Sequence, residues 1–468
     1  MKKRRKYASG SITVLLSLVM TTVLILTTAC TELSRTALIK AQMVADCENA
    51  MASILAEYNR PLLERYDIFG MDGAYGGSSF NSKKMEDRMK DYMAGLRGES
   101  GIALGYGEEK LSTDNYGFLT DKCGSEVRSQ AVTFIKKAYG LDILGNLADI
   151  PGIIKDYEDN EEEVNEVRSK DLGEDEGGIL SSIRSMRSMS ILRAIFGFSP
   201  GVSSAKTQRG QLLSNRRSDL FKDEGLISGS FADKMLFQEY IMKKFTNYVN
   251  APADEEGNPH VLKYEVEYIL CGHEDDKSNL AETAKNLVRI REVANFLYIQ
   301  TDEAKQGEAE LVATAICMLL LMPEFIDAVK EIILGGWAYA ESICDVRTLL
   351  RGGKVPLVKS ETTWKTGLFD IVNPMGSGVL RTDEGLDYGT YLRVLLFMKN
   401  EADKTGRAMD IMELNVKATQ GYGNFGLDNC LFGFGMTGTF TINHIFGGLG
   451  RSKLDYRGAI SYEMLEKR

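Results

Sequence analysis

The sequence has few of the residues that build metal centres. Its 468 residues include three histidines, His260, His273 and His444, and no HxxxH or HExxH spacing occurs. The seven cysteines are scattered and form no CxxC pair. Because zinc centres need such clustered ligands, we expect no metal site. The odd, sparse set of thiols is not a disulfide scaffold, although the sequence leaves one bridge open.

Basic residues are fewer than acidic residues. The chain has 56 Lys and Arg against 66 Asp and Glu, with a formal net charge of −10. Five of the basic residues lie within the first six positions, so the rest of the chain is more acidic still. Binding to a phosphate backbone needs a basic surface, and we therefore expect no nucleic-acid partner.

The catalytic motifs in the sequence lack the context that their chemistry requires. Residues 433–438 match GxGxxG, but residues 439–442 continue as strand-like sequence where a dinucleotide site needs a helix. Residues 197–201 match GxSxG, but a helical pattern precedes Ser199 where the nucleophile elbow of a hydrolase needs a strand. We therefore expect a protein without catalytic activity or cofactor, and an enzyme that uses Ser199 is the weaker alternative.

The most informative stretch is a long uncharged run near the N-terminus. Residues 2–6 are all basic, and the following 25 residues, Tyr7 to Thr31, carry no charge. As a helix this run is about 37 Å long, and a bilayer core is about 30 Å thick. We predict a cytoplasmic basic head at 1–6 and a transmembrane helix at 7–31, with everything after it outside the cell membrane. A cleaved secretory signal and a lipoprotein cut before Cys30 are the alternatives.

A stalk helix is predicted at residues 32–66, directly after the apolar run. Apolar residues recur there at steps of three or four and give one stripe: Leu33, Ala37, Ala41, Val44, Cys47, Met51, Ile54 and Tyr58. The apolar run itself contains five hydroxyl side chains of interest: Ser17, Thr21, Thr22, Thr27 and Thr28. They could contact another helix in the membrane or bond to the preceding turn of their own helix.

The remaining sequence divides into three predicted parts. Residues 67–155 are expected to form an extracytoplasmic helical region. The acidic residues 156–178 lack the glycine-centred ligand spacing of a calcium loop and are expected to form a solvated linker. Residues 179–468 are expected to form an extracytoplasmic body in which helices are interleaved with a few strands.

Three stretches of this body define the predicted fold class. Residues 262–270 and 430–442 alternate between apolar and other residues, which predicts a strand at the first stretch and a long strand or hairpin at the second. Residues 311–323 carry no charge but are too few to cross a bilayer, so they predict a buried core helix. The predicted fold is α+β: a long N-terminal transmembrane and stalk helix followed by a mainly helical body with a small antiparallel sheet.

The N-terminal region resembles a known family. The basic head, the residues Gly10–Val14, the apolar run, and Leu55–Tyr58 leading to Asp67–Gly70 resemble the minor pseudopilins of tight-adherence (Tad) pilus systems. They are similar, more narrowly, to large extracytoplasmic proteins with TadE/TadG-like leaders. The chain departs from the pilin-type pattern at Leu15, where such leaders carry glutamate.

The resemblance implies a role and a processing site. Prepilin peptidase would cut between Gly10 and Ser11. The protein would be a structural component of a Tad-type pilus assembly or secretion system, with the bilayer and other proteins of that apparatus as partners. The alternative is a membrane-tethered binding or sensory protein of the cell surface with no pilus role.

Overall fold

The chain folds into two compact units. The computed structural model describes residues 10–98, 105–140, 145, 150–170, 178–197, 201–219, 230–251, 259–371, 384–445 and 450–466. The first unit, here called the anchor unit, comprises Met1–Leu63, Phe69–Leu119 and Asn424–Arg468. The second, here called the helical unit, comprises Glu64–Ile68 and Thr120–Gly423. In chain order the larger segment of the helical unit is therefore inserted between two strands of the anchor unit.

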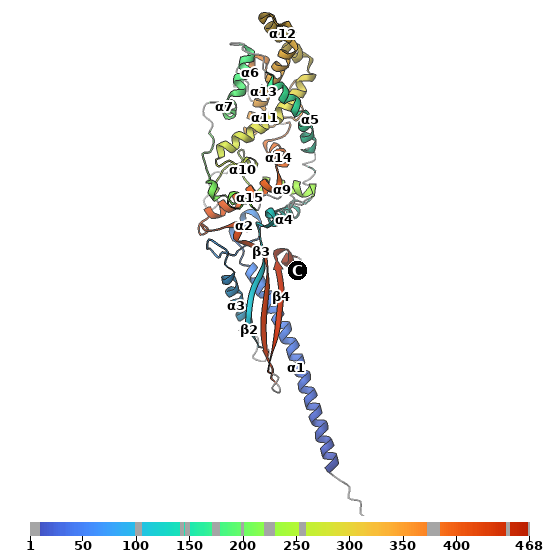
Figure 1. Ribbon diagram of the computed structural model, residues 1–468. Helices are drawn as coiled ribbons and strands as arrows, with labels where there is room; N and C mark the ends of the chain where they lie inside the picture. The colour runs from blue at the N-terminus through green and yellow to red at the C-terminus, as the bar shows by residue number, and fades with distance from the viewer. Residues whose placement is uncertain are drawn as a thin grey trace, which may run out of the picture. The chain divides into compact units, whose positions relative to one another are not determined.

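The anchor unit combines one long helix with a small antiparallel sheet (Figure 1). Its elements are α1 (Gly10–Leu55), β1 (Met71–Asp72), α3 (Ser82–Gly98), β2 (Tyr106–Phe118), β3 (Cys430–Asn443), β4 (Arg451–Ser461) and α16 (Tyr462–Glu466). Strand β3 is central, because it pairs with β2 and with β4 over the same residues and so must use its two opposite edges. The short β1 pairs with the first residues of β3.

The core of the anchor unit lies between the sheet and the second half of α1. The buried side chains of β3 alternate along the strand, as expected for a sheet with one covered face. They include Phe434, Met436, Phe440 and Ile442. Met85, Met89 and Met93 of α3 pack into the same core. Flexible methionine side chains suit the irregular space between a helix and a twisted sheet.

The GxGxxG glycines belong to this sheet. A Cβ atom on Gly435 would lie 2.3 Å from Oδ1 of Asp114 on β2, and one on Gly433 would lie 2.6 Å from the carbonyl oxygen of Ile460 on β4. β3 continues to Asn443, so no helix follows the glycines as a dinucleotide site would need. The glycines allow close contacts between strands, as the sequence context indicates.

The helical unit is built around two long helices, α11 (Asp276–Thr301) and α13 (Ile326–Leu350), which pack along one another. The other α-helices of this unit are α4 (Asp121–Tyr139), α5 (Ile150–Ser169), α6 (Ile179–Ser188), α7 (Ile191–Phe196), α8 (Leu213–Arg216), α9 (Phe231–Lys244), α10 (Glu265–Cys271), α12 (Glu303–Leu320), α14 (Tyr388–Met398) and α15 (Glu401–Ala418). Helix α2 (Arg60–Tyr66) contains the boundary between the units, and α1 ends before it, so the predicted stalk is two helices.

The α+β fold class is confirmed: the chain is mainly helical, with one small antiparallel sheet and a long apolar N-terminal helix. Two stretches differ from their predictions. Region 67–155, expected to be helical, contains the 13-residue strand β2. Residues 156–169, expected to be linker, belong to α5, where Tyr157, Val164 and Val167 are buried. Residues 171–177 of that predicted linker lie outside the described residues.

The predicted strand at 262–270 is wrong. Residues 265–271 form helix α10, and nearly all of its side chains are buried, including Glu265 and Glu267. Their carboxylates accept hydrogen bonds from the backbone amides of Thr246 (2.9 Å) and Tyr248 (2.8 Å). The alternation of apolar and charged residues therefore did not indicate one exposed and one buried face, because both kinds of residue are buried.

Candidate functional site

The first half of α1 exposes a continuous apolar surface. The large side chains from Ile12 to Leu26 are all exposed; that of Ile12 has a relative exposure of 72%. The segment Ile12–Leu55 is long and apolar enough to cross a membrane, and no other helix within the described ranges is. A lone span of this kind near the N-terminus is also compatible with a signal sequence.

The hydroxyl groups of this apolar half bond to their own helix. Ser17 Oγ donates to the carbonyl oxygen of Val14 (3.0 Å), and Thr27 Oγ1 donates to that of Leu24 (3.0 Å). Thr21, Thr22 and Thr28 make the same kind of bond to the preceding turn. Their donors are thus satisfied without water or a second helix, which suits a hydrocarbon environment.

The second half of α1 buries one face against the sheet. The buried stripe consists of Ile39, Met43, Cys47, Ala50, Met51 and Ile54. The predicted stripe is correct at Cys47, Met51 and Ile54 but wrong at its start, where Leu33 is 72% exposed. Ala37 and Ala41 of the predicted stripe are exposed as well.

A polar clamp joins α1 to the β3–β4 hairpin where the uncharged run ends. Glu32 Oε1 lies 2.9 Å from His444 Nδ1 and accepts from Arg35 Nη1 at 3.0 Å. His444 Nε2 lies 2.7 Å from Ser452 Oγ, and Arg35 also donates to the carbonyl oxygen of Asn443 (3.0 Å). The hydrogen bond with His444, followed by the charge of Arg35, holds the pKa of Glu32 below its usual value, although partial burial opposes this.

We interpret this cluster as a structural clamp. Hydrolase triads also have a serine in contact with a histidine that contacts a glutamate. Here, however, Arg35 donates to the same carboxylate oxygen that faces the histidine. The contacts tie α1 to residues more than 400 positions away in the sequence. They therefore fix the direction in which α1 leaves the sheet.

A second polar contact lies deeper in the same interface. Asp46 is 1% exposed, and its Oδ2 accepts a hydrogen bond from the hydroxyl of Tyr106 on β2 (2.7 Å). Gln42 Nε2 donates to the other oxygen (2.7 Å), so both carboxylate oxygens are paired. A buried carboxylate satisfied from two elements sets the register of helix and sheet, because a shifted helix would leave it unpaired.

The predicted cleavage bond lies at the very start of the described helix. Helix α1 begins at Gly10, so the Gly10–Ser11 bond is in its first turn. The predicted basic head, residues 1–6, lies outside the described residues, as does Ser199 of the GxSxG motif. Gly197 ends α7 with a φ of +83°, a left-handed conformation that glycine adopts without strain.

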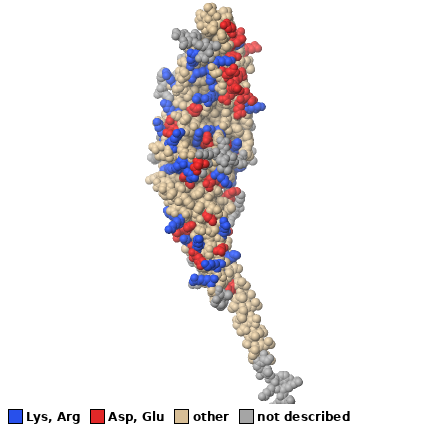
Figure 2. Space-filling model, viewed as in Figure 1, with Lys and Arg blue, Asp and Glu red and all other residues tan. Residues whose placement is uncertain are grey.

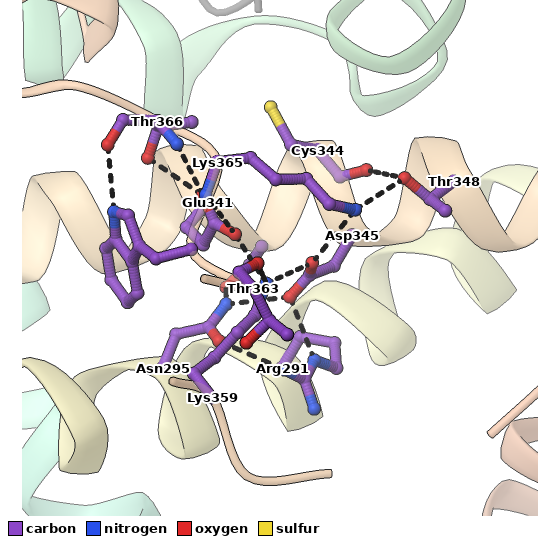
Figure 3. A network of polar contacts seen from close by, with 12 residues as sticks. Arg291, Asn295, Glu341, Cys344, Asp345, Thr348, Lys359, Thr363, Lys365 and Thr366 are labelled. Carbon is purple, nitrogen blue, oxygen red and sulfur yellow. Dashed lines mark hydrogen bonds and ion pairs between the residues drawn. The ribbon is translucent and has the colours of Figure 1, made fainter. Parts of the chain in front are cut away.

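The most concentrated polar chemistry in the helical unit is a buried ionic network (Figure 3). Asp345 on α13 accepts from Arg291 Nε on α11 (3.1 Å) and from Lys359 Nζ (2.7 Å). Lys359 also donates to Glu341, one turn earlier on α13. Glu341 Oε2 accepts further bonds from the backbone amide and the hydroxyl of Thr366, both at 2.9 Å.

This network is closed to solutes. The side chains of Arg291, Glu341, Asp345 and Lys359 are each 0% exposed, and that of Lys365 is 2% exposed. Burial opposes the ionisation of Asp345, but the charges of Arg291 and Lys359 outweigh it and lower its pKa. Burial also lowers the pKa of Lys365. The network joins α11, α13 and the segment around residues 359–366, and its role is to position these elements.

Another buried carboxyl, Glu267 on α10, has an incomplete set of partners. Its Oε1 accepts from the hydroxyl of Tyr388 (2.6 Å) and from the amide of Tyr248, whereas Oε2 is buried with no hydrogen-bond partner among the described residues. Burial raises the pKa of Glu267 to about 7. The folded state therefore binds this proton more tightly than the unfolded state, and the associated stability is lost as pH rises from about 4.5 to about 7.

Two further features of the described residues are the cysteine side chains and an open groove. None of the seven cysteines is in a disulfide, and Cys30 on α1 is exposed. A groove of about 880 Å³ lies in the helical unit and is lined by Gly201–Ala205, Tyr248, Val249, Ala251, Lys263, Tyr264 and Leu350–Gly352. It is within the size range of small-molecule sites.

Comparison with known proteins gives one match. Residues 169–442, more than half of the chain, match the model of a family described as a family of unknown function, DUF5702. The matched region begins at the last residue of α5 and ends within β3. No curated protein and no solved structure matches the chain.

Proposed function

The chain belongs to the DUF5702 family, whose description names no activity, and on this premise we propose a function from the anchor unit. We propose that the protein is a membrane-anchored, extracytoplasmic structural component of a Tad-type pilus assembly or secretion system. In this role it resembles a minor pseudopilin and has no catalytic activity. In this arrangement the basic residues 2–6 lie in the cytoplasm, residues 7–31 cross the membrane, and the chain from Glu32 onward lies outside the cell membrane.

The observation that carries the proposal is the division of α1 into two halves. A pseudopilin needs a helix whose first half is soluble in lipid and whose second half packs on its own globular unit. In α1, the side chains from Ile12 to Leu26 are exposed and apolar, whereas Ile39 to Ile54 contribute to the core under the sheet. The clamp at Glu32 lies between the two halves and holds the exposed half away from the sheet.

Photo-crosslinking in cells tests the proposed role. A photoreactive residue at Val19, in the exposed apolar half, is expected to give an adduct with a pilin or a platform protein of the apparatus. The same residue at the exposed Lys40, in the second half of α1, is the control for general proximity. The proposal is wrong if the Val19 adducts contain no protein of a pilus or secretion apparatus, or if alkaline carbonate releases the chain from membranes.

Mass spectrometry of the mature N-terminus tests the processing site. We expect the mature chain to begin at Ser11, and a Gly10→Val variant to keep its basic head. A Leu15→Glu variant restores the residue that pilin-type leaders carry and should enter filaments more readily than the natural chain. A mature chain that begins at Met1 or Cys30 would contradict the assignment.

A second candidate function is that of a tethered binding protein. The groove beside Tyr248, Tyr264 and Arg351 favours it, because aromatic and cationic groups around a groove of this size suit a small anionic ligand. Saturable binding of such a ligand that is lost on Arg351→Ala, together with normal pili in cells that lack the chain, would favour this candidate over the first.

A further inference from the structure

Helix α12 buries small side chains and exposes large apolar ones, which is the reverse of an ordinary surface helix. The residues it buries against α13 are small: Ala309, Ala313 and Cys317. The large apolar residues face outward, and Leu311 and Leu319 are 74% and 81% exposed. The prediction that residues 311–323 form a buried core helix is therefore wrong, since only the small-residue face of α12 is covered.

The exposed side chains follow one face of the helix and continue into the turn after it. Exposed residues recur at Gly307, Leu311, Ala315, Met318 and Met322, in steps of three or four. This is the spacing with which a helix is recognised in a groove of another protein. We call the patch formed by Leu311, Ala315, Met318, Leu319, Leu321 and Met322 the α12 patch.

The turn that completes the α12 patch is held in a costly conformation. Leu321 has a φ of +57° and is 86% exposed. The left-handed region is unfavourable for a residue with a side chain, and glycine would avoid this strain. The turn is fixed by backbone hydrogen bonds from Leu321 N to Met318 O (3.3 Å) and from Met322 N to Cys317 O (2.9 Å). The turn therefore presents a large apolar side chain where folding alone would favour a small one.

The charges around the α12 patch are mainly acidic. No charged residue occurs from Leu311 to Pro323, and the exposed charges on either side are Glu308, Glu310, Glu324 and Asp327. Two bases of α12 and α13 are paired with acids, Lys330 with Glu310 and Lys305 with Asp302. Figure 2 shows a surface without charged side chains at the end of the helical unit that carries α12, with acidic side chains next to it.

We propose that the α12 patch docks into an apolar groove of a partner protein whose rim is basic. An apolar centre with an acidic surround is electrostatically complementary to such a groove. An anionic bilayer would repel the acidic surround. A second copy of the chain would bring the same acidic residues together, which opposes self-association. The proposal goes beyond the pilus role and does not depend on it.

Site-specific photo-crosslinking of the full-length chain in cells tests this proposal. A photoreactive residue at Met318 is expected to give one discrete adduct with another protein. The same residue at Ala304, exposed at the opposite end of α12, is the matched control and should not give it. Mass spectrometry should place the crosslink in a partner peptide with lysine or arginine nearby.

Two variants separate the apolar and the electrostatic contributions. Leu319→Glu should reduce the Met318 adduct at least tenfold, and so should the double variant Glu308→Lys, Glu324→Lys. Both leave the buried face of α12 unchanged, and an unaltered urea midpoint by tryptophan fluorescence verifies that they fold. An adduct with lipid, an adduct with a second copy, no adduct above the Ala304 control, or an adduct that survives both variants would each overturn the proposal.

Discussion

Removing the carboxylate of Asp345 is the most direct test of the buried network. Its Oδ1 accepts from Lys359 and its Oδ2 accepts from Arg291 and from Asn295 Nδ2, at distances between 2.7 and 3.1 Å. In Asp345→Asn one of these oxygens becomes an NH₂ group that faces a donor. The three buried cations of the network would then be opposed by Glu341 alone.

The expected loss of stability is large. Breaking a buried ion pair by removing one partner costs about 3–5 kcal/mol, because it leaves an uncompensated buried charge. With a urea dependence of about 3 kcal/mol per molar, the midpoint of unfolding should fall by about 1 M or more. Asp327→Asn is the control, since Asp327 is exposed on the same helix and its loss should change stability by less than about 0.5 kcal/mol.

Tryptophan fluorescence of the full-length chain in detergent gives a specific assay. The chain has two tryptophans, and both lie in the helical unit next to the network. The indole groups of Trp337 and Trp364 donate to the same acceptor, the carbonyl oxygen of Thr366, at 2.9 and 2.8 Å. If the Asp345→Asn midpoint matches that of Asp327→Asn, the network does not stabilise the unit and the reasoning fails.

Three further predictions concern other parts of the structure. Glu267→Gln should stabilise the helical unit by about 2–4 kcal/mol at pH 8 and by much less at pH 4.5, because burial raises the pKa of the acid to about 7; equal urea midpoint shifts at both pH values would contradict this. Gly336→Ala should cost about 1–3 kcal/mol, since its Cβ would lie 2.5 Å from a buried α6 side chain, whereas Gly307→Ala, with open space, should gain up to about 1 kcal/mol; the reverse order of urea midpoints would refute it. His444→Ala should speed limited proteolysis of the β3–β4 hairpin, and Asn443→Ala should not, because the clamp uses only the backbone carbonyl of residue 443; equal cleavage rates would rule out the clamp.

Several features followed from the sequence because their signals are local. The 25-residue uncharged run is long enough to cross a membrane whatever it packs against, and its residues from Gly10 onward form the first half of α1. The alternation at 430–442 correctly predicts β3, since one face of this strand is covered and the other is not. The absence of a helix after the GxGxxG glycines was also readable from the residues that follow them.

Other features depended on partners far away in the chain. Strand β2 is polar and has no clear periodicity, and it becomes a strand because it pairs with β3, over 300 residues later. The clamp between Glu32 and His444 spans 412 positions, so no local pattern could predict it. The network around Asp345 likewise joins α11, α13 and a loop, although its charged residues are ordinary in the sequence.

The amino-acid sequence by itself determined which stretches are apolar. The tertiary structure decided whether other parts of the chain cover each of them. Helix α10 carries charged residues but is buried, because neighbouring segments supply hydrogen bonds to its carboxylates. Helix α12 is apolar but largely exposed, because α13 covers only its small-residue face. Burial is a property of the surroundings of a residue, and those surroundings come from distant parts of the chain.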